Sequence, residues 1–399
     1  MRILLGAIYP YAFLLLYLII PFDNYIRALP NILLGILLVA FPFIVKKEDF
    51  KKLKSVPAFL FFLFFLFLIL NAGLFGRLET DFNIIKKVLI AVGLIILYIP
   101  VGDVGKMKRA ITFSSLAAIL FSIVTIVISI NGSGDMILED YPKLIEILLI
   151  DRLYLGFLGV LSILISFDSL KKEFHPENRY YLFNIIVNLL FLLLIASKIA
   201  LIILLFAFML RQFYGRRNNI KIIAAVLLFS LVAAVFISVK EDIQNKKFLT
   251  ANTEIESNFI KNSLTWDTRT VVWHCANIIS REIGFSINGL GFKGSKDRLV
   301  ECYDQKIQDN DKRARFMSAR FNTHNQFIDF YLSSGIIGLL IFASTLLFLF
   351  LRGRKSFFVT SLLLVLVSYC FVENIFHRQL GAYFAGFIMI CLLLQKREN

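Results

Sequence analysis

Charge is scarce in this sequence. Asp, Glu, Lys and Arg together make up 18% of the 399 residues, against about a quarter in soluble domains. Apolar residues make up 58%, and almost no charge interrupts long stretches such as 3–20, 58–70, 111–130 and 220–239. In lipid, long apolar runs without strict alternation satisfy their backbone hydrogen bonds as helices, not as barrel strands. We therefore expect an all-α polytopic membrane protein whose first run is a retained helix rather than a cleaved signal peptide.

Other features are also missing. The chain has no internal repeat, no low-complexity tract and no Pro/Gly/Ser-rich linker that would mark a second domain. It has no CxxC motif and no clustered histidines, so we expect neither a metal site nor a cofactor. Cys370 and Cys391 fall in apolar runs, where inert thiols are expected. Cys275 and Cys302 share one polar segment, where a disulfide is chemically allowed if the segment lies outside the cell.

The apolar runs predict about twelve transmembrane helices, near 3–20, 30–45, 57–75, 85–101, 110–130, 143–167, 180–196, 199–210, 221–239, 326–351, 356–374 and 379–394. Lys and Arg are dense in alternate gaps between them, namely 46–56, 102–109, 167–179, 211–221, 352–355 and 396–397. By the positive-inside rule these gaps are cytoplasmic, which puts both termini inside. The net charge of +15 is therefore explained by the Lys and Arg residues of the cytoplasmic gaps and does not indicate a nucleic-acid partner.

One long gap is different. Residues 240–325 are polar, hold 14 Lys or Arg and 11 Asp or Glu, and follow a helix expected to leave the cytoplasm. Recurring aromatic and aliphatic residues indicate that this segment is ordered and partly helical. We therefore divide the chain into helices one to nine (1–239), an external loop (240–325), and helices ten to twelve with a short cytoplasmic tail (326–399).

Ionisable residues within or beside membrane spans are energetically expensive, so each one needs a reason. The expected topology brings several of them to the external surface. Arg152 follows Asp151 near the outer end of the sixth helix, and Lys198 lies between two short helices. The others are Arg269 and Trp273 on one face of a helix in the external loop, His324 and Asn325 just before the chain re-enters the membrane, and Glu373, His377 and Arg378 near the outer ends of the last two helices.

Each candidate also has a purely structural explanation. Arg152 can pair with Asp151 or extend to the interface, and Lys198 can do the latter from its turn. Arg269 alone can be a solvated residue, His324 a helix cap, and Arg378 an interface anchor. Their shared side of the membrane favours the functional interpretation.

Residues 289–294 spell GxGxxG, the pattern of a dinucleotide-binding turn. Such a site needs a preceding strand and a βαβ unit of about 30 residues. An external loop of a membrane protein offers neither, so Asn288 and Gly289 are interpreted as a turn.

Taken in order, these residues resemble the O-antigen ligase and polymerase superfamily of bacterial surface-polysaccharide enzymes. The resemblance covers the architecture of about twelve helices with the main external loop between the ninth and tenth. The family's short motifs match five places in this chain: Arg152 in DRLYLGFLG, Ser197-Lys198, Arg269 in DTRTVVW, the turn at Gly289 and Gly291, and His324-Asn325 before Gly335-Ile336-Ile337-Gly338. The family has Arg at the position of Lys198. A lysine there keeps the positive charge but lacks the planar guanidinium group, which can bind two phosphate oxygens at once.

The resemblance implies a metal-independent, inverting glycosyltransferase in the bacterial inner membrane with its active site on the periplasmic face. The donor would be a glycan on a polyprenyl (undecaprenyl) diphosphate carrier, and the acceptor a hydroxyl of lipid A-core or of a growing glycan. Arg152 and Arg269 would stabilise the diphosphate leaving group, and His324 would be the general base. Lys198, Asn325, Trp273, Glu373 and Arg378 are the expected substrate-binding residues.

Three alternatives stay open at this point. A polymerase would use the same chemistry with a different acceptor; the single dominant external loop favours a ligase. A polysaccharide flippase or other transporter would more often show internal repeats and broken helices at the membrane midplane. A non-catalytic assembly protein would need no such set of histidine and arginine residues.

Overall fold

The structure, a computed structural model, describes residues 2–133 except 24 and 27, 148–214 except 172 and 174, and 267–394. Within these ranges every regular element is a helix. The predicted helix 221–239 and residues 240–266 of the predicted loop lie outside the described residues.

The main bundle contains α1 (Arg2–Ile19), η1 (Ile20–Phe22), α2 (Leu29–Ile44), η2 (Lys47–Leu53), α3 (Val56–Leu74), α4 (Leu78–Tyr98), α5 (Val104–Ser133), α7 (Arg152–Ser169), α8 (Pro176–Leu194), α9 (Lys198–Arg211), α15 (Gln326–Gly353), α16 (Phe357–Val372), η3 (Ile375–His377) and α17 (Gln379–Leu394).

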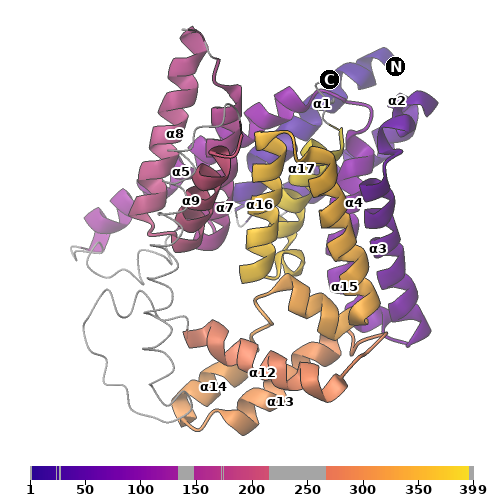
Figure 1. The fold of residues 1–399 in the computed structure, drawn as a ribbon. Coiled ribbons are helices and arrows are strands. Elements are labelled where there is room, and N and C mark those ends of the chain that lie inside the picture. Colours follow the sequence, from indigo (N-terminus) through magenta and orange to yellow (C-terminus); the bar gives the residue numbers. More distant parts are fainter. Residues whose placement is uncertain are drawn as a thin grey trace.

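Three more helices form a group of their own at one end of the bundle, namely α12 (Asp267–Ile283), α13 (Phe292–Lys306) and α14 (Asn310–Ala319) (Figure 1). Together with Leu332 of α15 they enclose a second, smaller apolar core. A disulfide between Cys275 and Cys302 joins α12 to α13. The chain termini lie at the opposite end of the bundle (Figure 1).

The bundle is built around two helices that are buried over most of their length. Every residue of α17 from Gly381 to Leu394 is buried, as is every residue of α7 from Tyr154 to Ser166. Phe157 of α7 stacks on Tyr369 of α16, with the two ring centroids 4.0 Å apart. Around this centre, α3 packs on α15, α4 on α17, and α7 on α8. The helices at the periphery of the bundle leave large apolar side chains exposed, as expected where lipid is the solvent.

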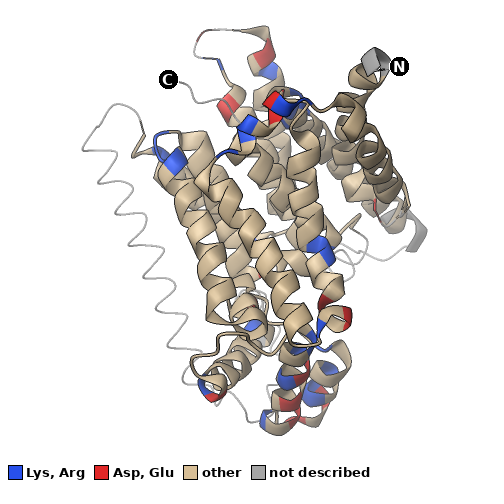
Figure 2. Ribbon diagram, turned by 90° about the vertical axis from the view of Figure 1, so that its right-hand side faces the viewer, with Lys and Arg blue, Asp and Glu red and all other residues tan. Residues whose placement is uncertain are grey.

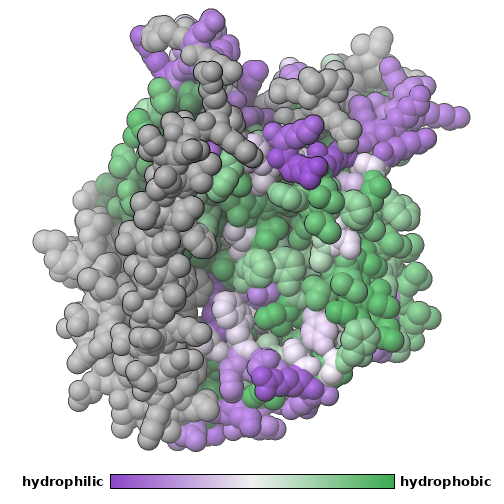
Figure 3. Space-filling model, in the orientation of Figure 1, coloured by the Kyte–Doolittle hydropathy of each residue, from purple (hydrophilic) through white to green (hydrophobic). Residues whose placement is uncertain are grey.

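The described helices bear out a polytopic membrane protein. Five are long and apolar enough to cross a bilayer, over Leu5–Phe22, Val56–Leu74, Val104–Ser129, Arg152–Ser169 and Gln326–Gly353. The bent pair α2 and η2, at 119° to each other, makes a sixth candidate. On the face shown in Figure 3, the coloured residues are mainly apolar across the middle and hydrophilic above and below. The total of twelve spans stays a prediction.

Charged residues gather at the two ends of the helices and leave the middle almost uncharged (Figure 2). Contacts connect the described Lys/Arg-dense gaps with one another. Lys52 donates to the carbonyl of Ile99, and Lys108 binds Asp168 and lies over the ring of Phe358. The hydroxyl of Tyr214 donates to the carbonyl of Arg354. The described parts of these gaps therefore share one face of the bundle, as the alternation of charge density predicted. The assignment of that face to the cytoplasm remains a prediction.

Four predicted helix starts were wrong. The fourth helix begins at Leu78 instead of residue 85, because its polar first two turns continue beyond the apolar stretch. The fifth begins at Val104 instead of residue 110, and the seventh at Pro176 instead of residue 180.

The sixth helix, predicted at 143–167, begins at Arg152; residues 143–147 lie outside the described residues. Asp151 does not interrupt that helix but caps it, since its carboxylate accepts the backbone N–H of Leu153 at 2.9 Å. In these cases hydropathy marked the apolar segment and not the start of the helix.

Helix α15 is broken at Gly335, whose φ of 74° and ψ of −175° lie outside the helical region. The break opens the backbone of α15 to the segment between α12 and α13. Ser286 O accepts the N–H of Ile336 at 2.8 Å, and Gly291 N–H donates to Ser333 O at 2.9 Å. A Cβ atom at Gly335 would clash with the carbonyl of Ile287. Glycine at this position therefore permits both the backbone angle and the close approach of the two chains.

The GxGxxG segment has a related structural role. Gly291 precedes the first residue of α13, and the carboxylate of Asp81 from α4 accepts the N–H groups of Phe292 (2.8 Å) and Lys293 (3.3 Å). An acidic side chain thus occupies the positive end of this helix, where a phosphate would lie in a nucleotide site. Arg77 donates to the carbonyl of Gly289 at 2.9 Å. The motif fastens α13 to the bundle.

We expect Gly335→Ala to lower the stability of the protein strongly. A non-glycine residue at this φ costs about 1–3 kcal/mol, and the clash with Ile287 adds to it. Gly93→Ala is the matched control, because Gly93 lies within α4 and its Cβ would meet nothing within 4 Å. Thermal unfolding in detergent measures both. A melting temperature for Gly335→Ala as high as that of Gly93→Ala would show that the break in α15 is dispensable.

Candidate active site

An imidazole and a carboxylate form a pair where α15 begins and α16 ends. His324 Nδ1 lies 3.3 Å from Glu373 Oε2, and the two side chains are 21% and 12% exposed. His324 has a φ of 43°, a left-handed conformation that non-glycine residues rarely adopt. The N–H of His324 donates to the side chain of Asn322. Backbone strain of this kind tends to persist where the surrounding structure enforces a functional geometry.

Buried polar groups hold the two chain segments of this pair together. Asn374 is fully buried, and its side-chain oxygen accepts the N–H of Asn325 at 2.9 Å. The Thr323 hydroxyl donates to the carbonyl of Asn325 and accepts from Asn374 Nδ2, both at 2.9 Å. His324 is therefore flanked on both sides by residues that are bound to the neighbour of Glu373.

Asn325, predicted to bind substrate, has a second structural task. Its side-chain oxygen accepts the N–H groups of Phe327 (3.0 Å) and Ile328 (3.1 Å) and so caps α15. This contact fixes the start of the helix directly after His324. A role in substrate binding stays a prediction.

Helix α12 brings Arg269 and Trp273 to the same place, as their spacing on one helix face predicted. Arg269 Nε donates to the carbonyl of Val372 at 3.2 Å, directly before Glu373. The indole N–H of Trp273 donates to the carbonyl of Thr323 at 3.0 Å, directly before His324. One face of α12 is thus attached to both chain segments that carry the histidine–glutamate pair.

The electrostatics of the pair and of Arg269 are coupled. Burial raises the pKa of the Glu373 carboxyl, but the hydrogen bond and charge of His324, the Asn374 N–H and the charge of Arg269 outweigh it, so the pKa lies below its usual range. Burial lowers the pKa of the Arg269 guanidinium; Glu373 and Asp151 oppose that effect and Arg152 adds to it. At neutral pH Glu373 is therefore ionised.

Arg152 and Lys198 begin α7 and α9, and both are half-buried. A Cβ atom at Gly156 would clash with the hydroxyl of Ser197, so the starts of these helices touch. The charge of Arg152 acts on both Lys198 and Arg269. Three cations from separate helices thus lie within electrostatic reach of one another.

Arg378 pairs with Asp151, with Arg378 Nη1 3.4 Å from Asp151 Oδ2, and its guanidinium lies over the ring of Tyr154. The carboxylate of Asp151 also caps α7, and through Arg378 it binds the segment that follows Glu373. Arg378 therefore joins the outer end of α7 to the start of α17.

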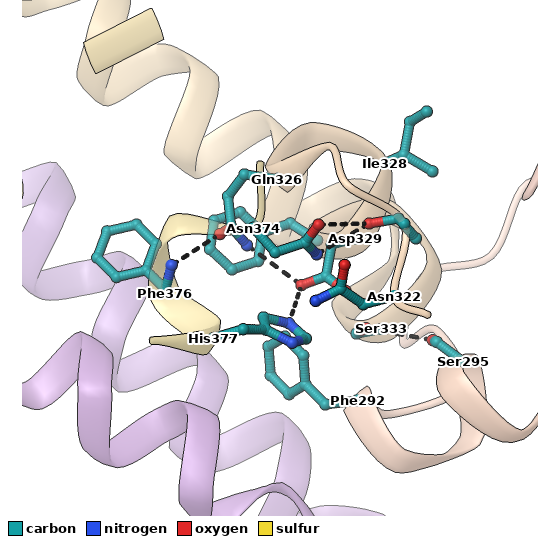
Figure 4. Close-up of polar contacts among 12 residues, drawn as sticks. Phe292, Ser295, Asn322, Gln326, Ile328, Asp329, Ser333, Asn374, Phe376 and His377 are labelled. Atoms are coloured by element: carbon teal, nitrogen blue, oxygen red, sulfur yellow. Dashed lines mark hydrogen bonds and ion pairs between the residues drawn. The ribbon is translucent and has the colours of Figure 1, made fainter. Parts of the chain in front are cut away.

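A second buried pair, shown in Figure 4, was not predicted from the sequence. His377 Nε2 lies 2.8 Å from Asp329 Oδ2, and the Asp329 side chain is only 4% exposed. Gln326 Nε2 donates to the same carboxylate at 3.1 Å, while Gln326 Oε1 accepts the N–H of Phe376 at 3.0 Å. The ring of Phe292, from α13, lies against His377. An acidic residue at the start of an apolar helix was the available signal, but its partner lies 48 residues later.

The structure therefore brings together at one end of the bundle all eight residues predicted for the site: His324, Asn325, Glu373, Arg269, Trp273, Arg152, Lys198 and Arg378. His274, which follows Trp273 on α12, is exposed. Among the described residues there is no group of three or more His, Cys, Asp or Glu side chains that could hold a metal ion.

Residues 183–343 match the O-antigen ligase family, a segment that contains Lys198, Arg269, His324 and Asn325. The match confirms the resemblance to the O-antigen ligase and polymerase superfamily. No curated protein matches the sequence.

We expect His377→Ala to destabilise the protein, because it leaves the buried carboxyl group of Asp329 without the imidazole that lies 2.8 Å from it. Leaving a buried polar group without its partner costs about 1–3 kcal/mol. Asp329→Asn combined with His377→Ala should regain part of the lost melting temperature, because the carboxyl group that lost its partner is then gone. His274→Ala, at an exposed histidine, is the control. A double variant less stable than His377→Ala would mean that the two side chains do not stabilise each other.

Proposed function

Because residues 183–343 match the O-antigen ligase family, we propose that this membrane protein transfers a glycan from a polyprenyl diphosphate carrier to an acceptor hydroxyl. We propose further that it is a ligase whose acceptor is lipid A-core, and that its site faces the periplasm across the inner membrane. The observation that carries the proposal is the His324–Glu373 pair beside the buried Arg269.

His324 is the proposed general base. With its proton on Nδ1, the imidazole donates to Glu373 and leaves the Nε2 lone pair available for the proton of the acceptor hydroxyl. Glu373, which is ionised, would then stabilise the imidazolium that forms. The acceptor oxygen attacks the anomeric carbon as the bond from that carbon to the phosphate oxygen breaks, so the sugar inverts and polyprenyl diphosphate leaves.

The cations have a matching role. Negative charge develops on the diphosphate as it leaves, and preorganised cations in a site shielded from water stabilise such charge most effectively. Arg269 is held by the carbonyl of Val372, next to Glu373. Arg152 and Lys198 lie within electrostatic reach. The position of the site at one end of the bundle suits a donor whose lipid tail stays in the membrane.

Surface glycan from a deletion strain, resolved by size on a gel, tests this assignment. A ligase predicts loss of all polymer from the lipid acceptor while carrier-linked chains accumulate. Single repeat units still attached to the acceptor would assign the protein as a polymerase. Glycan of unchanged length retained on the cytoplasmic side would overturn the transferase assignment in favour of a flippase.

Complementation of that strain tests the residues. Arg152→Ala and Arg269→Ala should abolish transfer while the protein still inserts, and Arg→Lys at either position should rescue only in part, because a point charge replaces a planar fork. His324→Ala should reduce turnover by about 10²–10⁴-fold, the usual contribution of a general base. The matched controls lie on α12 and are exposed: Arg281→Ala for the arginines and His274→Ala for the histidine.

Near-normal turnover by His324→Ala, with an unchanged pH profile, would remove it as the base. Full activity of Arg269→Ala would remove α12 from the mechanism.

Chelation tests the predicted independence from metals. The proposed cations can neutralise a diphosphate without a metal ion, so purified protein should keep its activity in EDTA. Loss of activity in EDTA that Mg²⁺ or Mn²⁺ restores would contradict the mechanism.

A further inference from the structure

Between α12 and α13 the chain makes a short turn, Gly284–Asn288, that carries two exposed apolar side chains. Phe285 is 80% exposed and Ile287 is 58% exposed. Both belong to the group of helices outside the bundle, where polar residues prevail. Large apolar side chains so exposed need a partner surface.

Backbone contacts fix the height of this turn along the bundle. Ser286 O accepts the N–H of Ile336, the first residue after the break in α15. From there to Gly353 the helix has 18 residues, about 27 Å at 1.5 Å per residue, close to the roughly 30 Å of a hydrocarbon core. The turn therefore lies level with the edge of the hydrocarbon.

Helix α3 gives the same height independently. The side chain of Asn71, in the last turn of this apolar span, donates to the carbonyl of Asn288 at 2.9 Å. Arg77 donates to the same carbonyl at 3.1 Å. The hydroxyl of Tyr331 also donates to the carbonyl of Gly284. The turn is thus held against the bundle at both of its ends.

The exposed side chains of the turn continue an apolar surface that faces lipid. Helices α3 and α15 pack on each other and expose Leu70, Leu74, Ile337 and Leu340. Leu74, at the outer end of α3, is 80% exposed. Ile287 lies directly against the break at Gly335, two residues before Ile337. The turn therefore extends this surface from the bundle onto α12–α14.

We propose that the turn Gly284–Asn288 inserts Phe285 and Ile287 into the lipid leaflet on the side of α12–α14 and so anchors these helices to the membrane. The partner is the boundary between acyl chains and headgroups, where an aromatic ring and a branched aliphatic side chain are both stable. One end of α12 is then held by lipid contact and the other by Arg269. The proposal goes beyond glycan transfer and stands independently of it.

Spin labels attached to single introduced cysteines test the anchor in bilayers. Phe285→Cys and Ile287→Cys report on the turn, and Ala314→Cys, exposed on α14, is the control. Cys370 and Cys391 are buried and Cys275 is joined to Cys302, so the unmodified protein should take up little label. Collisions with oxygen, which concentrates in lipid, and with a water-soluble nickel complex measure the depth of each label.

We expect oxygen collisions to exceed nickel collisions at 285 and 287, and the reverse at 314. Nickel accessibility at 285 and 287 equal to that at 314 would place the turn in water and overturn the proposal. Shielding of both positions from both reagents would assign the surface to a protein partner, such as a second copy of the chain, and would overturn it as well.

Discussion

The arrangement of the site depends on one buried side chain, that of Asn374. It binds the hydroxyl of Thr323 before His324 and the backbone N–H of Asn325 after it, and it follows Glu373 directly in the chain. A buried amide must satisfy the hydrogen-bonding capacity of both its oxygen and its nitrogen. The hydrogen bonds of Asn374 therefore fix the relative position of the segment around His324 and the segment around Glu373. The left-handed backbone at His324 is enforced by that relation. The orientation of the imidazole toward the carboxylate follows from it.

Directional polar and backbone contacts attach α12–α14 to the bundle, in addition to the apolar packing of Phe292 and Leu332. Asp81 caps α13, Arg77 and Asn71 bind the turn before it, and the break at Gly335 pairs with the same turn. Such contacts are directional. They fix the position of α12 across the end of the bundle, and with it the position of Arg269, more narrowly than nonspecific apolar packing would.

Several features of the fold were predictable from the sequence because they depend on local composition. Apolar runs predicted α1, α2, α3, α16 and α17 to within two residues at each end, and the density of Lys and Arg predicted which gaps share a face. The starts of α4, α5, α7 and α8 were not predictable in this way. Helices end where capping groups satisfy the backbone, and Asp151 does so at a point inside the apolar run.

The sequence by itself determined that the protein is a helical membrane protein and which residue types gather at one end of it. Charge is excluded from hydrocarbon wherever it occurs, so its pattern is readable from composition alone. Only the tertiary structure decided the pairs: His324 with Glu373, Asp329 with His377, and Asp151 with Arg378. Their members are separated by 48 residues or more in the chain, and no local rule relates them. Such pairs form only when buried polar groups from different helices have no water to bind and must satisfy one another.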